Sequence, residues 1–329
     1  MADQTMEGAL ARPARRRASP LARFRRWEAS GVLVALVVLC TLLAVASPNF
    51  FTLSNLPIVM RNASFVGLVA LGQTLVLLIG GIDLSVGTAA GLSAVVGALM
   101  LTKLGLNPYL VFVLTALFGL CLGFFNAAFI AKLRLNPFIV TLASGEIFAG
   151  LNLVITQGYP VRPLGPTFRS VGQGEVFGVP VPVLVFLFAG ALLWFVLSRT
   201  RFGRNIYAVG GNRDAANLVG IRVWRVEFLV FGLAGLFAAL AGVLYASRMD
   251  AAQPSVGEGW MLSAITAAII GGTSLRGGEG TVVGTVLGAI LLTVLQNGTV
   301  LLNVSGYWQR VIIGSVVLVA VLVDLFRRK

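Results

Sequence analysis

The sequence predicts an all-α, polytopic membrane protein with about ten transmembrane helices. Of its 329 residues, 57% are hydrophobic and 11% are charged, and the mean hydropathy is +0.93. Soluble domains have about 25% charged residues and fewer apolar ones. Apolar segments also recur from residue 31 almost to the end of the chain, and a helix needs about 20 such residues to cross a bilayer. Both observations favour a bundle of membrane-spanning helices.

The apolar segments follow one another with short polar connections. We place the expected spans at 31–47, 57–79, 84–102, 109–131, 138–156, 180–198, 224–246, 258–272, 280–302 and 307–325. The eighth is the weakest, because its apolar part is short for a complete crossing. If it dipped in and returned, the C-terminal Arg327, Arg328 and Lys329 would face outward, against the positive-inside rule. We therefore keep ten spans and expect this helix to be short or broken.

The basic residues support one orientation. Residues 1–30 hold seven of the 25 lysines and arginines and predict a disordered cytoplasmic tail, with 31–329 as the transmembrane domain. The alternative is a cleaved signal peptide with an apolar core at 31–43. With the N-terminus inside, most other basic residues also face the cytoplasm, and so do both termini. The net charge of +13 thus indicates membrane topology rather than binding to nucleic acid.

The segment 199–225 is the most heavily charged between the two ends of the chain. It is predicted to be cytoplasmic and to contain one short helix, with Asn212 as N-cap, Asp214 in the first turn and Gly220 at the end. The turns of this helix would present Ala215, Ala216, Leu218 and Val219. Such a partly apolar helix requires either the membrane surface or a groove on a partner.

A glycine-rich motif occurs twice. Residues 79–87 read IGGIDLSVG and residues 270–278 read IGGTSLRGG, each between two adjacent apolar spans. Paired glycine-interrupted segments in corresponding parts of a transporter point to the transport path. Asp83 and Ser274 would each cap the following helix, or Asp83 would contact the solute directly. The candidate path residues in these motifs are Asp83, Ser85, Thr273 and Ser274.

Glu146 lies well inside the expected span 138–156. An ionisable residue there is costly, so it faces a cavity or has a structural partner. Three weakly polar residues on the same span, Thr141, Ser144 and Asn152, complete the candidate translocation path. A lining of this kind suits a neutral polar solute such as a sugar.

Two expected outer segments, 157–179 and 248–258, are either ordinary connections or a docking rim for an external partner. The candidate docking residues are Arg162, Arg169, Asp250 and Glu258. Gly-x-x-x-Gly pairs occur at Gly87/Gly91, Gly119/Gly123 and Gly284/Gly288, and they predict close helix packing in a tight bundle or a dimer.

No catalytic pattern is present. The chain has no histidine, no nucleophile elbow and no phosphate-binding loop, so we expect neither an enzyme nor a metal site. An active transporter built on this chain must take its energy from a separate subunit or from an ion gradient.

Four stretches resemble the permease subunits of bacterial ABC sugar importers of the ribose, xylose, arabinose and galactoside type. They are IGGIDLSVG (79–87), NPFIVTLAS (136–144), RFGRNIYAVGGNRDAANLVGIRV (201–223) and IIGGTSLRGGEGTVVGTVLGAILLTVLQNG (269–298). The resemblance runs from about residue 50 to the C-terminus. Branched-chain amino-acid permeases are similar over part of the glycine–aspartate pattern.

The resemblance implies import of a monosaccharide or related polyol across the inner membrane by alternating access. It implies a second permease copy, identical or paralogous, a cytoplasmic ABC ATPase that holds Mg-ATP, and a periplasmic sugar-binding protein, with no cofactor on this chain. The helix at 212–220 is similar to the family's coupling helix. Glu146 stands where relatives are uncharged and Ala149 at their arginine position, which makes Glu146 a candidate for altered selectivity. The alternative is an ion-coupled transporter in which Asp83 and Glu146 titrate.

Overall fold

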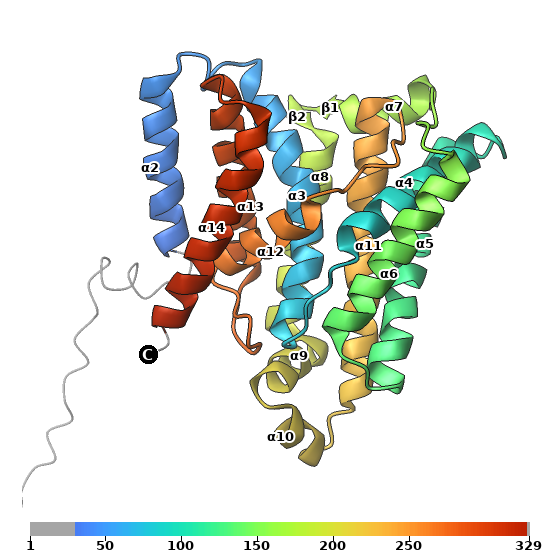
Figure 1. Cartoon of the computed structure of the whole chain (residues 1–329), viewed down its shortest axis with the longest axis vertical. Helices are drawn as coiled ribbons and strands as arrows, with labels where there is room; N and C mark the ends of the chain where they lie inside the picture. Colours follow the sequence, from blue (N-terminus) through green and yellow to red (C-terminus); the bar gives the residue numbers. More distant parts are fainter. Residues whose placement is uncertain (1–29, 328–329) are drawn as a thin grey trace, which may run out of the picture.

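The computed structural model describes residues 30–327 (Figure 1). The expected disordered tail at 1–30, apart from Ser30, and the last two residues lie outside the described residues. The described part is a helical bundle, which confirms the predicted all-α class. Its apolar helices are α2 (Ser30–Ala46), α3 (Asn55–Leu78), α4 (Val86–Thr102), α5 (Pro108–Ala127) with the π-turn η1 (Ala128–Lys132), α6 (Pro137–Thr156), α8 (Val181–Arg199), α11 (Val223–Met249), α12 (Trp260–Ile270), α13 (Val282–Leu301) and α14 (Gly306–Arg327).

Each of the ten expected spans coincides with one of these helices. Six of them are long and apolar enough to cross a membrane, judged by length and composition: α3, α5 with η1, α6, α8, α11 and α13. The remaining four have shorter apolar stretches, namely α2, α4, α12 and residues 306–319 of α14. The expected short eighth span is α12, with 11 residues.

Helix α3 is the centre of the bundle. It packs against α11, α13, α12 and α8, and almost all of its most apolar window is buried. Because protein surrounds it, this helix tolerates polar side chains that lipid would disfavour. Ser64, Gln73 and Thr74 are all buried, and Thr74 Oγ1 lies 2.7 Å from Thr285 Oγ1 on α13.

Glycines bring several backbones into direct contact. On α5, a Cβ atom added at Gly123 would lie 2.1 Å from the carbonyl oxygen of Phe231, and one at Gly119 would lie 2.5 Å from that of Gly235. Both contacts are with α11. Sequence left open whether the Gly-x-x-x-Gly pairs pack within one chain or between two copies. The other four glycines, Gly87, Gly91, Gly284 and Gly288, also meet backbone atoms of their own chain.

Helices α4 and α12 begin midway along the bundle (Figure 1). An irregular segment, 250–259, leads from the end of α11 to the start of α12 and packs on the first half of α4. A Cβ atom at Gly87 or Gly91 would lie 2.4 Å from the carbonyl oxygen of Gly257 or Val256, respectively. Irregular backbone at this depth is tolerated where protein covers it or where it lines a cavity.

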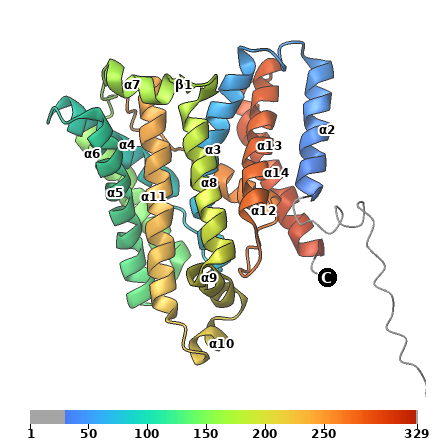
Figure 2. The same cartoon turned by 180° about the vertical axis from the view of Figure 1, so that it is seen from behind.

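The two ends of the bundle carry different short elements (Figures 1 and 2). At one end, called the α7 end, lie α7 (Pro166–Gln173) and the hairpin of β1 (Glu175–Val176) and β2 (Val179–Pro180). At the opposite end, called the α10 end, lie α9 (Arg201–Gly211) and α10 (Arg213–Leu218). Sequence reasoning found α10 but missed α9, whose N-cap signal is Thr200, which accepts a hydrogen bond from Gly203 N at 3.2 Å.

Candidate functional site

Helix α10 has the caps that its sequence predicts. The Asn212 side chain accepts a hydrogen bond from Ala215 N at 2.9 Å, and Asp214 lies exposed in the first turn. The helix ends at Leu218, and Gly220 follows with φ of +86°, a backbone conformation that favours glycine. These local signals make a six-residue helix at the edge of the molecule.

The tip of α10 is apolar and exposed. Leu218 is 88% exposed and Val219 is 77% exposed, and Ala215 is exposed beside them. The prediction that Ala216 is presented as well is wrong, because its side chain is only 3% exposed and faces the chain's own interior. Two large apolar side chains that project from a charged segment are typical of a protein contact.

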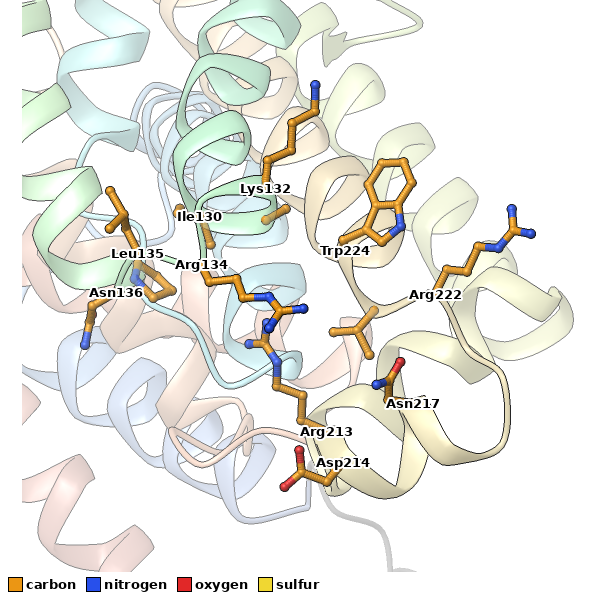
Figure 3. A pocket seen from close by; sticks show the side chains of 13 residues that line it. Ile130, Lys132, Arg134, Leu135, Asn136, Arg213, Asp214, Asn217, Arg222 and Trp224 are labelled. Atoms are coloured by element: carbon orange, nitrogen blue, oxygen red, sulfur yellow. The ribbon is translucent and has the colours of Figure 1, made fainter.

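A cavity of about 970 Å³ opens beside α10 (Figure 3). It lies between the connection from η1 to α6 on one side and α10 with the start of α11 on the other. Its charged lining residues are Lys132, Arg134, Arg213, Arg222 and Asp214, four cations and one anion. The Arg134 and Arg213 side chains point toward one another in Figure 3. Such a lining attracts an acidic group on a partner.

One of these cations has a partner within the chain. Arg213 and Glu227 form a two-pronged ion pair, with Nη1 to Oε1 at 2.7 Å and Nη2 to Oε2 at 3.1 Å. Because the Glu227 side chain is buried, this pair ties α10 firmly to α11. Among the described residues, Lys132, Arg134 and Arg222 have no ion pair, so their charge is left to the cavity.

The first glycine-rich motif forms a buried polar centre around Asp83, which is 2% exposed. Its Oδ1 accepts hydrogen bonds from Ser85 N at 2.8 Å and Ser85 Oγ at 2.6 Å. Ser85 Oγ accepts a further bond from Asn126 on α5 at 2.8 Å, and Leu84 N donates to Thr141 Oγ1 on α6 at 3.0 Å. Asp83 therefore closes the turn before α4. The N-cap position is Ser85, so the prediction that Asp83 caps this helix is wrong.

The candidate residues of α6 divide into two groups. Thr141, Ser144 and Asn152 are buried and hydrogen-bonded within the chain, and Asn152 Nδ2 donates to the Pro254 carbonyl at 2.6 Å. Glu146 is exposed, and no ion pair involves it among residues 30–327. Of the four candidates on this helix, Glu146 is thus the one that reaches the surface of a single chain.

The second glycine-rich motif does not cap the following helix, as had been expected of Ser274. Ser274 Oγ accepts a hydrogen bond from Arg276 N at 3.1 Å, which closes a turn. The N-cap of α13 is Thr281, which accepts from Gly284 N at 3.1 Å, so the prediction that Ser274 caps this helix is wrong. The connection is simply longer here than after α3. Thr273 is buried against Gly280 in the same connection.

Three of the four docking candidates lie together at the α7 end. Arg162 and Arg169 are exposed, and Arg169 Nη1 lies 3.7 Å from Asp250 Oδ2. Asp250 Oδ1 also accepts from Leu164 N at 3.0 Å, which holds the two outer segments together. Glu258 lies apart from them, because the residue before it, Gly257, packs against the backbone of Gly87 in the first turn of α4.

Sequence reasoning missed the cavity beside α10, whose two sides are formed by residues 130–137 and 213–224. A signal was present in Glu227, an acid in the first turns of a largely apolar span, where an unpaired charge would be costly. Its partner Arg213 could not be identified from spacing, because a turn separates the two helices.

Comparisons with known proteins agree with the motifs. Residues 55–322 match the family described as branched-chain amino acid transport system / permease component. The chain is 43% identical over 296 residues to the ribose import permease protein RbsC of Bacillus subtilis (strain 168), which covers 89% of this chain and 92% of the relative. It is 36% identical over 300 residues to the D-allose transport system permease protein AlsC of Escherichia coli (strain K12). That alignment covers 91% of this chain and 92% of the relative.

A third relative is the autoinducer 2 import system permease protein LsrC of Photorhabdus luminescens, 36% identical over 293 residues and covering 89% of this chain and 88% of the relative. No solved structure matches the chain. With the family match spanning almost all of the described bundle, the chain belongs to the branched-chain amino acid transport system permease component family.

Proposed function

We propose that this chain is the membrane-embedded permease subunit of an ATP-driven ABC importer, and that its solute is a monosaccharide of the ribose type or a related polyol. The observation that carries the proposal is α10, a capped helix that offers exposed Leu218 and Val219 beside a basic cavity. The relatives named for ribose and D-allose supply the solute class, and the weakly polar residues of α6 agree with an uncharged solute.

In this proposal the chain is a multi-pass protein of the inner membrane and a transporter rather than an enzyme. Mg-ATP is bound and hydrolysed on a separate ATPase subunit, against which α10 docks. A periplasmic binding protein delivers the solute to the α7 end, where Arg162 and Arg169 are exposed. Nucleotide-driven movement of α10 then alternates the access of the path between the two ends, since each state binds its partners differently.

The exposure of Glu146 on α6 is an argument for a second permease copy. A carboxylate on an apolar helix surface is expensive in lipid and is tolerated where a water-filled path or another protein covers it. Its neighbours Leu142, Ile147 and Leu151 on α6 are exposed too. We therefore place this face of α6 against a second copy, with Glu146 beside the path that the two copies enclose.

The partner assignment is tested by gentle extraction of tagged protein from native membranes and identification of what co-purifies. We expect a protein with phosphate-binding-loop motifs in stoichiometric amount, lost when α10 is altered. If tagged protein that still supports uptake brings no ATPase, and uptake follows the membrane potential instead of ATP, the chain is an ion-coupled transporter and the proposal fails.

Glu146→Gln is expected to change the preference among sugars. A hydrogen bond to a charged group contributes about 1.5–3 kcal/mol, so the ratio of uptake rates for two sugars shifts by about tenfold. Competition uptake across a panel of pentoses and hexoses measures this ratio. Glu146→Asp keeps the carboxylate and is the matched control. An unchanged ratio in Glu146→Gln would remove Glu146 from the path.

A further inference from the structure

The two glycine-rich motifs meet the end of α9 at one point. Three segments take part: the turn after α3, the connection between α12 and α13, and the last residues of α9. We call the cluster formed by Gly80, Gly210, Gly277, Gly278 and the Leu78 carbonyl the glycine junction. It lies toward the α10 end of the bundle, where α3 and α9 approach each other in Figure 1.

The junction is a contact of backbone with backbone. Gly278 N donates a hydrogen bond to the Leu78 carbonyl at 2.9 Å, which joins the second motif to the end of α3, directly before the first motif. A Cβ atom at Gly210 would lie 1.8 Å from that same oxygen and 2.5 Å from Gly278 N. One at Gly277 would lie 2.8 Å from Gly80 N and 2.9 Å from the Gly210 oxygen. No side chain separates the three segments, so none of them shifts without pushing the others.

Helix α9 connects this junction to α10 over a very short distance. Gly210 and Gly211 end α9, Asn212 caps α10, and no flexible linker intervenes. Ile206 and Val209 bury one face of α9 in the core. The Tyr207 hydroxyl donates to the Gly280 carbonyl at 2.9 Å, a second link from α9 to the connection before α13. A displacement of α10 is therefore carried into α9 as a unit.

Beyond the junction, each motif leads into the interior of the bundle. The turn after α3 continues to Asp83 and Ser85, whose hydrogen bonds reach α5, and to Leu84, which is bonded to α6. The other connection runs back through Thr273 to α12 and on through Gly280 to the start of α13. The glycine junction is thus the place where one surface helix contacts both interruptions of the bundle at once.

We propose that the glycine junction is the element that transmits movement of α10 to both interior turns, with Gly210 as its positioning residue. This inference rests on the proposed ABC permease function. Contiguous packing of rigid elements carries energetic coupling between distant sites, and backbone contacts have no flexible side chain to absorb a shift. Coupling through this point requires Gly210 to remain in contact with the Leu78 carbonyl and with Gly278.

Gly210→Ala tests the proposal in the complete transporter. The added methyl group forces α9 away from the two motifs, whereas Gly211→Ala, one residue on, places a methyl group where no atom lies within 4 Å. In reconstituted vesicles we expect Gly210→Ala to keep the ATPase bound and to hydrolyse ATP at its unstimulated rate. Stimulation of hydrolysis by solute and binding protein should fall by about tenfold or more, and uptake with it. Gly211→Ala should behave as wild type.

Tyr207→Phe is the milder variant, because it removes one hydroxyl and no packing volume. We expect it to assemble normally and to lower the ratio of stimulated to unstimulated ATP hydrolysis severalfold, a change that a loss of stability alone would not produce. If Gly210→Ala assembles and keeps full stimulation, the proposal is wrong. It is equally wrong if Gly210→Ala fails to assemble and Tyr207→Phe keeps the wild-type ratio. A wild-type complex with no ATP-dependent uptake would instead refute the proposed function.

Discussion

Leu218→Asp is expected to abolish uptake and to release the ATPase while the chain still inserts in the membrane. Leu218 is 88% exposed at the tip of α10, so the substitution removes no internal contact. Burial of a leucine in a partner contributes about 1.5–3 kcal/mol, and a carboxylate in an apolar pocket adds a desolvation cost. Together these weaken the association by about 100-fold or more. Co-purification and vesicle uptake measure both effects.

Two controls separate docking from folding. Leu218→Met keeps the apolar volume and should retain the ATPase. Phe177→Asp introduces the same charge at an exposed aromatic residue of the β1–β2 hairpin, at the opposite end of the bundle, and should leave ATPase binding unchanged. Normal uptake by Leu218→Asp would contradict the assignment of α10 as the coupling helix.

Gly123→Leu is expected to destabilise the bundle strongly. A Cβ atom at this position would lie 2.1 Å from the Phe231 oxygen and 2.8 Å from Gly232 Cα, both backbone atoms of α11. Rigid backbone does not yield as a side chain does, so α5 and α11 must separate along their packed length. Overpacking of a core costs about 1–3 kcal/mol for smaller intrusions, and we expect a loss above about 3 kcal/mol here. The loss is measured by thermal unfolding of the detergent-extracted protein, with the fraction that stays monodisperse recorded at each temperature.

Gly314→Leu is the matched control for this change. Gly314 is also a helical glycine, on α14, but a Cβ atom there would have no neighbour within 4 Å. It should leave the unfolding temperature close to wild type. Equal stability of Gly123→Leu and the wild-type protein would show that α5 and α11 are not held by the glycine contact.

Local patterns predicted what depends on local chemistry. The ten apolar segments correctly predicted the ten apolar helices, because the composition of each segment determines that it forms a helix, whatever its neighbours are. Asn212 and Gly220 gave α10 its start and end for the same reason. Helix α9 was missed, since its 11 residues include five glycines and arginines, which obscure the one buried face formed by Ile206 and Val209.

Contacts between residues far apart in the sequence could not be predicted from such local patterns. Glu258 was placed with the outer segments by its position in the chain, but the backbone of Gly257 enters the bundle and packs on Gly87. The polarity of Thr141 and Asn152 predicted a lining, whereas both side chains are used in hydrogen bonds that hold adjacent segments. In each case the deciding contact joins residues more than 50 positions apart, which periodicity does not encode.

The position of α3 sets an order of events during biosynthesis. This helix is made early, yet the helices that cover it, α11, α12 and α13, come from the second half of the chain. At about 5–20 residues per second, the ribosome needs on the order of ten seconds after α3 before α11 begins to emerge. During that interval Gln73 and Thr74 lack the neighbours that later enclose them. The insertion machinery must therefore shelter α3 from lipid until the C-terminal half arrives, and truncation before α11 should expose it to membrane quality control.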